Sequence, residues 1–407
     1  MKPTKHKFTT LKQVMDTIPA YLIPSLAKKH GIDKKSRTFS PWSHVVTMVY
    51  AQLSHALSLN DVCDSLRNHT SAFFTMRRAT SASRNGLSHA NKVRSADMAE
   101  DLFWNVLYRY KSLCPKFASH TNSFKIPRRF KRVINIVDST TIKLVSNCMD
   151  WAKHRRRKAA AKCHMRLDAH SYLPSFALVK TAKSHDSKEA VELCAGIQAG
   201  EIVVFDKAYI DFEHLFSMNT RGVFWVSRAK DNMAYRVVKK RSLKKNSAIL
   251  LDAEIKLTGI QSSVNYPKRL RLIRAIVEVN NEDVEMEFIT NNTDWAPSSI
   301  CDLYKCRWGI ESFFKQLKQT LQLADFLGYS ENAVRWQIWT ALLTYVMLRF
   351  IAYMNKWKGS FSRLFTVIRG VLWSRFDLVN VLQKCGTASN QNRTCAQPYQ
   401  LYIPGIL

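Results

Sequence analysis

The sequence predicts a mixed α/β fold, in which a helical N-terminal region precedes a central sheet that is covered by helices. Apolar residues recur at helical spacing from Trp42 to Leu53 and again from Met98 to Tyr108. Short β-branched runs then occupy residues 133–226, with helical stretches between the later ones. Strands that alternate with helices in this way are typical of one sheet packed between helical layers.

The charge balance favours a polyanionic partner. The chain has 407 residues, which suggests two or three domains, and 46% of them are hydrophobic, enough for a sizeable core. Its 62 Lys and Arg against 31 Asp and Glu give a net charge of +31. Nucleic acid is the commonest partner of so basic a chain. Charge alone leaves open a generic basic protein, such as an RNA-associated factor.

Cysteine usage and hydropathy indicate a cytoplasmic protein that does not enter the membrane. The nine cysteines form no C-x-x-C pair, so we expect reduced thiols and neither a disulfide framework nor a structural zinc site. The first 15 residues lack the apolar region of a signal peptide. The most apolar stretch, Trp336–Leu348, spans 13 residues, too few to cross a bilayer, and is predicted to be a buried helix.

Residues 1–125 are predicted to form a helical DNA-binding domain. Residues 1–132 carry 23 Lys and Arg against 7 Asp and Glu. A turn at Ser81–Gly86 leads into Leu87–Lys92, a pattern that suits a helix-turn-helix module. A helical scaffold with a solvated basic face is an equally good interpretation.

Residues 126–230 and 286–355 are predicted to form the α/β core. The expected elements are, in order, strands at Val133–Val137, Thr141–Val145, Cys163–Ala169 and Phe176–Thr181, a helix at Lys188–Ile197, a strand at Ile202–Phe205, a helix at Phe212–Met218, a strand at Val223–Val226, and helices at Pro297–Leu321 and Val334–Met354. Residues 356–407 are predicted to begin as a helix and to end in a polar tail.

The segment 231–285, between these two parts of the core, is polar and strand-like. It carries two basic clusters: Arg236, Lys239, Lys240, Arg241, Lys244 and Lys245, then Lys268, Arg269, Arg271 and Arg274. Both clusters are expected to contact the DNA backbone, so that affinity falls with salt. Arg228 and Lys230, just before this segment, could join them, although a solvated strand end is equally consistent with these two residues.

Two aspartates are expected to meet at one edge of the sheet. Asp138 and Asp206 each end an apolar predicted strand, and ligand sites of α/β sheets collect at the carboxyl ends of strands. Either aspartate alone is better explained as a helix cap or a turn residue.

A third acid lies on a polar face of the helix predicted over 297–321. Tyr304, Arg307, Glu311 and Lys318 fall within one arc of about 60° at helical spacing. A face with an acid, two bases and a phenol suits the lining of a site. The alternative is a solvated face with an Arg307–Glu311 ion pair, worth only about 0.2–0.5 kcal/mol.

These residues resemble the YREK signature of DDE insertion-sequence transposases, the group named after insertion sequence four. Asp138-Ser139-Thr140-Thr141 is similar to the first catalytic block of that family, and Asp206-Lys207-Ala208-Tyr209 to the second, with Ala208 where glycine is common. The basic run Lys158–Lys162, followed by His164, and residues 40–100 also resemble segments of the family. The resemblance extends to about residue 355.

The resemblance implies an RNase H-like catalytic core, interrupted by a β-rich insertion between Asp206 and Glu311, for which residues 231–285 are the natural candidate. It assigns Asp138, Asp206 and Glu311 as catalytic metal ligands. Three carboxylates close together repel one another, and oxygen-only ligation points to Mg²⁺, for which Mn²⁺ could substitute. Arg307 and Lys318 are expected to hold phosphates, and Tyr304 to bond a phosphate or stack on a base.

The implied activity is cut-and-paste transposition: the protein would cleave the ends of its insertion sequence and join the 3′-OH ends to target double-stranded DNA, as a homodimer on DNA. In this family an aromatic residue of the insertion can receive a flipped base, and Tyr266 is the only aromatic between the two basic clusters, whereas Trp225 is expected in the core. The alternatives are an RNase H-like nuclease that cuts without joining, and an inactive relative that only binds DNA.

Overall fold

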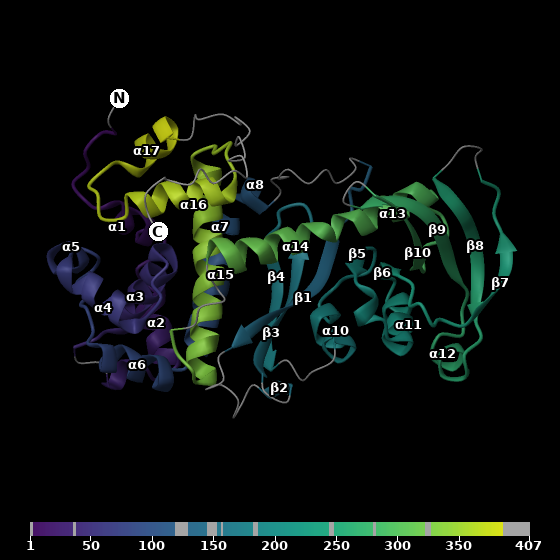
Figure 1. Cartoon of the computed structure of the whole chain (residues 1–407), viewed down its shortest axis with the longest axis horizontal. Helices are drawn as coiled ribbons and strands as arrows, with labels where there is room; N and C mark the ends of the chain where they lie inside the picture. Colours follow the sequence, from purple (N-terminus) through teal and green to yellow (C-terminus); the bar gives the residue numbers. More distant parts are fainter. Residues whose placement is uncertain are drawn as a thin grey trace, which may run out of the picture.

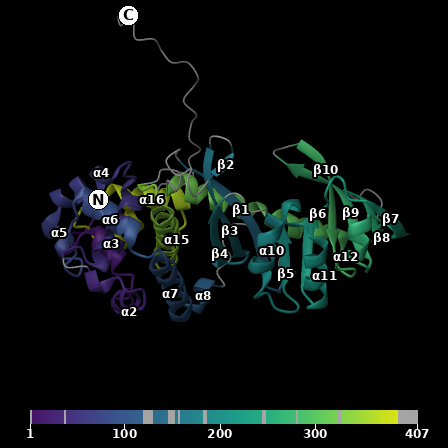
Figure 2. The same ribbon diagram turned by 90° about the horizontal axis from the view of Figure 1, so that it is seen from below.

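The computed structural model describes residues 3–35, 38–118, 129–144, 153–155, 158–181, 186–243, 248–279, 282–321 and 327–385. It confirms a mixed α/β architecture. A helical part and a large sheet lie side by side along the longest axis, and α15 (Glu331–Met354) stands between them (Figure 1). The view from below in Figure 2 shows the same sequence of parts, with β7–β10 at the end far from the N-terminal helices.

The helical part combines both ends of the described chain. Its α15 packs against three N-terminal helices, and the Thr10 backbone N–H donates to the Ser374 carbonyl at 2.9 Å. The predicted boundary at residues 125–126 and the predicted polar tail lie outside the described residues. The helices of this part are α1 (Thr10–Met15), α2 (Leu22–Lys29), the 3-10 helix η1 (Asp33–Lys35), α3 (Pro41–Ser54), α4 (Leu59–Asn68), α5 (Thr70–Phe74), α6 (Arg84–Val93), α7 (Asp97–Leu113), α8 (Pro115–Ala118), α15, α16 (Phe361–Gly370) and α17 (Leu378–Cys385).

Helix α15 extends beyond the 13-residue apolar stretch Trp336–Leu348 at both ends. It has 24 residues and, by length and composition only, is long and apolar enough to cross a membrane. However, 72% of its most apolar 18-residue window is buried inside the protein. Trp336 and Trp339 are each 1% exposed, so the prediction of a buried core helix is confirmed.

Ten strands form one sheet within the described residues. Their order is β2-β3-β1-β5-β6-β10-β9-β8-β7, with β4 paired to β3. Strand β1 is antiparallel to β3 and parallel to β5, which is parallel to β6. The strands are β1 (Ile134–Leu144), β2 (Lys153–Arg155), β3 (Lys158–Asp168), β4 (Pro174–Thr181), β5 (Ile202–Phe205), β6 (Phe224–Arg228), β7 (Tyr235–Lys240), β8 (Ile249–Leu257), β9 (Leu270–Val279) and β10 (Glu282–Thr290).

Helices cover both faces of this sheet, because successive side chains of a strand point to opposite faces. Ile136 of β1 belongs to the core that includes residues of α13 and α14, whereas Val137 belongs to a second core with residues of α10 and α11. The helices on the sheet are α10 (Asp186–Cys194), the 3-10 helix η3 (Lys207–Tyr209), α11 (Phe212–Thr220), α12 (Ile260–Asn265), α13 (Pro297–Cys306), α14 (Trp308–Lys315) and the π-helical turn η4 (Gln316–Thr320).

The first two predicted strands are one strand, so the prediction that Asp138 ends a strand is wrong. Strand β1 runs through Asp138 and pairs with β3 from Asn135 to Leu144. The polar run Asp138–Thr141 looked like a break in the sequence, but threonine fits a pleated strand well. Continuous pairing with β3 keeps the strand extended through it.

The single long helix predicted over 297–321 is divided. Helix α13 ends at Cys306, α14 begins at Trp308, and residues 316–320 form a π-helical turn. Such turns widen a helix locally and frequently occur at functional sites.

The predicted insertion is β-rich and continues the same sheet. After β6 the chain moves to the far edge, forms β7, β8 and β9, and returns through β10, which pairs with β6. Strand β10 therefore lies partly in the predicted insertion and partly in the predicted core.

Candidate active site

The parallel pairing of β1 and β5 brings two predicted acids together. Its register runs from Ile134 opposite Ile202 to Val137 opposite Phe205. Asp138 and Asp206 follow the last pair directly, so they lie side by side where the two strands part. Each carboxylate accepts a hydrogen bond from the backbone N–H of the next residue, at 2.7 Å for Asp138 and 2.8 Å for Asp206.

Arg307, at the junction of α13 and α14, connects the first aspartate to the predicted glutamate. Its Nη1 lies 2.9 Å from Asp138 Oδ2, and its Nη2 lies 2.7 Å from Glu311 Oε1. The Tyr304 hydroxyl donates to Asp206 Oδ1 at 3.4 Å. Lys318, on the π-helical turn, donates to the Thr141 carbonyl of β1 at 2.8 Å. The structure thus gathers Asp138, Asp206, Tyr304, Arg307 and Glu311 at one place, and Lys318 lies further along β1, at Thr141.

Burial and charge perturb the ionisable groups of this cluster. Burial raises the pKa of Asp138 to about 6, against the opposing effect of Arg307, and the negative charges of Asp206 and Glu311 add to the rise. Although burial lowers the pKa of Arg307, Tyr304 and the carboxylates raise it overall, so the guanidinium remains charged. The Arg307 side chain is 11% exposed and that of Glu311 56%. The cluster is therefore a partly desolvated carboxylate site held together by one cation.

The donor set has the chemistry of a hard divalent cation, since carboxylate oxygens are the ligands that Mg²⁺ prefers. Among the described residues, no group of three or more His, Cys, Asp or Glu lies close enough to hold a metal ion as it stands. The reason is visible in the contacts: the Arg307 guanidinium lies between Asp138 and Glu311. The carboxylate ligands fit a divalent metal ion. Metal binding would require the half-exposed Glu311 to exchange its contact with Arg307 for a contact with the metal.

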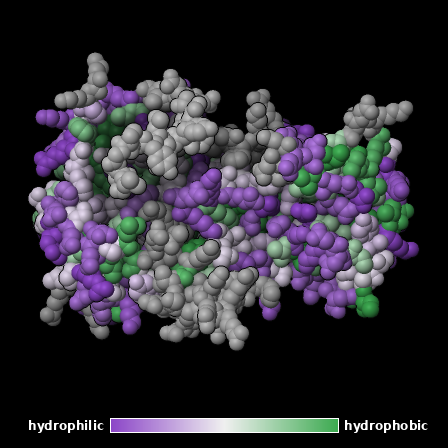
Figure 3. Space-filling model, viewed as in Figure 1, coloured by the Kyte–Doolittle hydropathy of each residue, from purple (hydrophilic) through white to green (hydrophobic). Residues whose placement is uncertain are grey.

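The predicted DNA-contacting residues divide into available and engaged groups. Lys239 and Lys240 are exposed on β7, the edge strand. Figure 3 shows hydrophilic residues over much of this face of the molecule, with hydrophobic patches at the end where β7–β9 lie. In contrast, Lys230 donates to the Ile210 carbonyl at 2.9 Å, and Arg241 forms an ion pair with Glu254 at 3.1 Å.

The remaining predicted DNA contacts are Arg228, Lys244 and Lys245. Arg228, at the end of β6, is half-buried and near enough to Tyr304 for its charge to lower the pKa of that phenol, although burial raises this pKa to about 12 overall. Lys244 and Lys245 lie outside the described residues.

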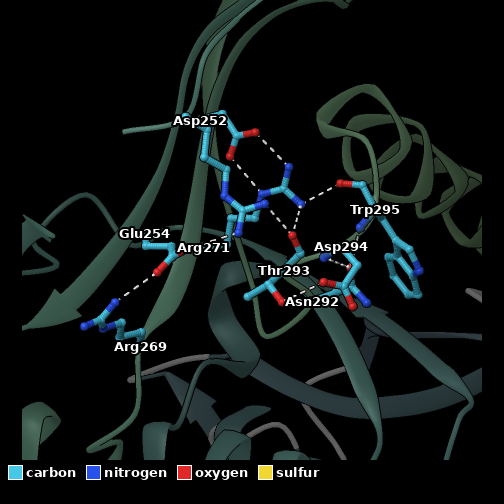
Figure 4. A network of polar contacts seen from close by, with 9 residues as sticks. Asp252, Glu254, Arg269, Arg271, Asn292, Thr293, Asp294 and Trp295 are labelled. Atoms are coloured by element: carbon cyan, nitrogen blue, oxygen red, sulfur yellow. Dashed lines mark hydrogen bonds and ion pairs between the residues drawn. The ribbon is translucent and has the colours of Figure 1, made fainter. Parts of the chain in front are cut away.

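One member of the second basic cluster, Arg271, is internal, which corrects its prediction as a DNA contact, whereas Lys268 and the Arg269 side chain are exposed. Arg271 is 2% exposed and bonds both carboxylate oxygens of Asp252 (Figure 4). Arg269 pairs with Glu254 at 3.2 Å, and Arg274 with Glu287 at 2.6 Å. The acidic partners lie on β8 and β10, the strands that flank β9.

Figure 4 also shows what this buried network connects. Arg271 reaches beyond the sheet to the carbonyls of Thr293 and Trp295, in the segment that leads into α13. The Asn292 side chain in turn accepts from the backbone N–H groups of Asp294 and Trp295. The insertion is thus anchored to the start of the helix pair that carries Tyr304, Arg307 and Glu311.

The two aromatic assignments have opposite outcomes. Trp225 is fully buried on β6, as predicted for a core residue. Tyr266 is 1% exposed and its ring meets those of Trp225 and Phe216 edge-on, so in this structure it is a core residue and is not available to a flipped base.

One part of the site was missed at the sequence level. Asp186, the first residue of α10, lies 3.0 Å from the Oγ of Ser139, the residue that follows the first aspartate. Its polar neighbourhood in the sequence carries no periodicity or motif that distinguishes it from an ordinary helix start.

A sheet that joins two aspartates beneath a helix bearing a glutamate defines a candidate DDE enzyme, a class that acts on DNA. The chain belongs to the transposase DDE domain family, which matches residues 129–347, more than half of its length. Residues 6–76 match a domain of unknown function, DUF4372. The resemblance to insertion-sequence transposases is thereby confirmed.

Two bacterial relatives illustrate the similarity. The chain is 28% identical over 278 residues to the putative transposase y4zB of Sinorhizobium fredii, covering 67% of this chain and 76% of that protein. It is 29% identical over 241 residues to the probable transposase for insertion sequence element IS5377 of Geobacillus stearothermophilus, covering 58% of this chain and 61% of that protein.

Among solved structures, the chain is similar to the piggyBac transposase in a synaptic complex with hairpin DNA, determined by cryo-EM. The TM-score is 0.41 at 9% identity, over 94% of this chain and 80% of that one. A TM-score this low carries no conclusion about the fold.

Proposed function

We propose that this protein is a cut-and-paste DNA transposase whose catalytic residues are Asp138, Asp206 and Glu311. The observation that carries the proposal is the arrangement of these three carboxylates: Arg307 bridges Asp138 and Glu311, and Asp206 follows the strand beside Asp138, where Tyr304 contacts it. Membership of the transposase DDE domain family supports the same assignment.

The three carboxylates would hold Mg²⁺, for which Mn²⁺ could substitute. When bound, two such ions supply activation of an attacking oxygen and stabilisation of the leaving 3′ oxygen. Arg307 and Lys318 exchange their present contacts for DNA phosphates, Arg307 in a bidentate manner and Lys318 as a point charge. Tyr304 lies 3.4 Å from Asp206, so its phenol orients this carboxylate or a phosphate beside it.

The remaining assignments follow the order of the sheet. Three antiparallel strands followed by two parallel ones, β4-β3-β1-β5-β6, support an RNase H-like core. The strands β7–β9 form the β-rich insertion, whose exposed Lys239 and Lys240 contact the phosphate backbone. The helical N-terminal region, residues 1–125, binds the transposon ends, and a homodimer assembles on double-stranded DNA because two ends must be joined.

The test is excision and end joining on a plasmid that carries the element's own ends. Glu311→Gln keeps the size of the side chain but removes the charge. It is expected to retain end binding and to lose cleavage. The loss should exceed about 100-fold, because residues that only orient the metal ligands already contribute about 10–100-fold. Glu331→Gln, at an exposed position in the first turn of α15, is the matched control and should cleave like the wild type.

Three outcomes separate the candidate functions. Equal cleavage by Glu311→Gln and the wild type would refute the catalytic assignment. Cleavage without capture of the ends in a target plasmid would favour a nuclease that does not join. End binding without any cleavage in Mg²⁺ or Mn²⁺ would favour an inactive DNA-binding relative.

A further inference from the structure

A second polar cluster lies directly behind the first aspartate. The carboxylate of Asp186 accepts from Ser139 Oγ at 3.0 Å and pairs with Lys162 Nζ at 2.7 Å. The ring nitrogen His164 Nδ1 lies 3.5 Å from the same carboxylate oxygen. These residues come from α10, β1 and β3, so one carboxylate links a helix to two neighbouring strands.

This cluster lies on the opposite face of the sheet from the candidate active site. Side chains alternate along β1, so Ser139 points to the α10 face while Asp138 points to the α14 face. The register supports this arrangement, because Ser139 lies opposite His164 in the β1–β3 pairing. The backbone N–H of Ser139 also donates to Asp138 Oδ1 at 2.7 Å. The hydrogen bond between Ser139 and Asp186 holds the backbone of β1 at this position. The Ser139 N–H in turn holds one carboxylate oxygen of Asp138.

The same cluster reaches the second aspartate. The Tyr209 hydroxyl lies 3.2 Å from His164 Nδ1, and the Tyr209 backbone N–H donates to the Asp206 carbonyl at 3.0 Å. Tyr209 belongs to η3, the short helix that Asp206 caps through the Lys207 N–H. One path of hydrogen bonds and short polar contacts thus joins the segments that carry Asp138 and Asp206, and its link between Asp186 and His164 is the 3.5 Å contact.

Burial makes this path rigid. His164 is fully buried and Tyr209 is 1% exposed, and the side chains of Lys162 and Asp186 are each only 16% exposed. Hydrogen bonds in so dry an environment are electrostatically stronger than in water, and breaking one leaves a polar group unpaired. A second ion pair provides a comparison: Glu189, on the same helix, pairs with Lys180 of β4 at 2.5 Å, and within the described part of the chain its carboxylate makes no hydrogen bond to Ser139, His164 or Tyr209.

We propose that Asp186 is a positioning residue that sets the separation of the Asp138 and Asp206 carboxylates for a divalent cation. It acts through Ser139 on the first carboxylate, and through His164 and Tyr209 on the second. The proposal rests on the proposed function, because it assumes that these two aspartates bind the metal. Outer partners of this kind orient the ligands, and their removal typically weakens metal affinity about 10–100-fold.

The experiment measures Mn²⁺ binding to the full chain without DNA, by electron paramagnetic resonance, beside the Mg²⁺ dependence of end cleavage. Asp186→Asn should weaken Mn²⁺ binding about tenfold or more and raise the Mg²⁺ concentration needed for half-maximal cleavage to a similar extent. Ser139→Ala removes one link without leaving a buried charge, and should weaken binding less. The double variant should weaken it no more than Asp186→Asn alone, since both act through one path.

The matched control is Glu189→Gln, which also converts a paired carboxylate of α10 to an amide. It should bind Mn²⁺ like the wild type, even where its melting temperature falls with that of Asp186→Asn. Equal Mn²⁺ affinity in the wild type, Asp186→Asn and Ser139→Ala would overturn the proposal while leaving the proposed function intact.

The failure of the proposed function has a different signature. A wild-type protein that binds Mn²⁺ but cuts no DNA would refute the proposed strand cleavage, and the binding curves would still decide the role of Asp186. A wild-type protein that binds no Mn²⁺ would overturn both.

Discussion

Replacing Arg271 by alanine is expected to destabilise the protein markedly, because it would leave a buried aspartate without a counterion. Arg271 Nε and Nη2 donate to the two carboxylate oxygens of Asp252 at 2.8 and 2.7 Å. The two side chains are 2% and 5% exposed, so water cannot replace the lost partner. The same substitution removes the bonds to the Thr293 and Trp295 carbonyls that anchor the insertion before α13.

The magnitude follows from this burial. Removing one partner of a buried ion pair costs about 3–5 kcal/mol, since the remaining charge is neither solvated nor paired. An unfolding entropy of about 2.1 cal/mol/K per residue amounts to roughly 0.85 kcal/mol/K over 407 residues. A chain that unfolds as one unit should therefore lose about 4–6 °C in melting temperature.

The assay is thermal unfolding at neutral pH, with Arg269→Ala as the matched control. Arg269 also forms an arginine–carboxylate pair, with Glu254 at 3.2 Å, but its side chain is 60% exposed. An exposed pair contributes about 0–1 kcal/mol, so its loss should shift the melting temperature by about 1 °C or less. The double variant Arg271→Met with Asp252→Leu replaces both charges of the buried pair by apolar side chains. It should recover much of the lost melting temperature. Equal melting temperatures for Arg271→Ala and Arg269→Ala would refute the reasoning.

Three further predictions concern DNA, protons and packing. Replacing Lys239 and Lys240 by glutamine should reduce the salt dependence of DNA binding, log Kobs against log salt, by about 1.8 if each lysine neutralises one phosphate; an unchanged slope would contradict their role. Because burial raises the pKa of Asp138 to about 6, protons should compete with metal below that pH. Mn²⁺ affinity should fall about tenfold per pH unit there and level off above pH about 7, and a flat profile would argue against Asp138 as a ligand. Gly309→Ala would place a Cβ 2.2 Å from the hydroxyl of the buried Tyr172, so it should cost about 1–3 kcal/mol in a denaturant titration and shift α14; wild-type stability and cleavage would exclude that crowding.

Local patterns in the sequence, together with the resemblance to a known family, were sufficient to select the candidate site. Two aspartates at the ends of apolar runs and one glutamate at helical spacing from an arginine are local patterns, and local patterns do not depend on the rest of the chain. The division of the helix near Arg307 did not separate these residues, since the two helical segments remain nearly continuous. The buried helix was predictable from its continuous apolar character, and the burial of Trp225 from the alternating strand on which it lies.

The tertiary structure decided which charged residues are internal and which polar residues support the site. Arg271 and Lys239 look alike in the sequence, yet one is paired inside the sheet and the other lies exposed on the edge strand. Asp186 gained its position from the packing of α10 against β3, and the ion pair of Arg307 with Asp138 joins residues 169 positions apart. The physical reason is that strand register and helix packing choose partners that are distant along the chain. No local pattern states which carboxylate will face which cation.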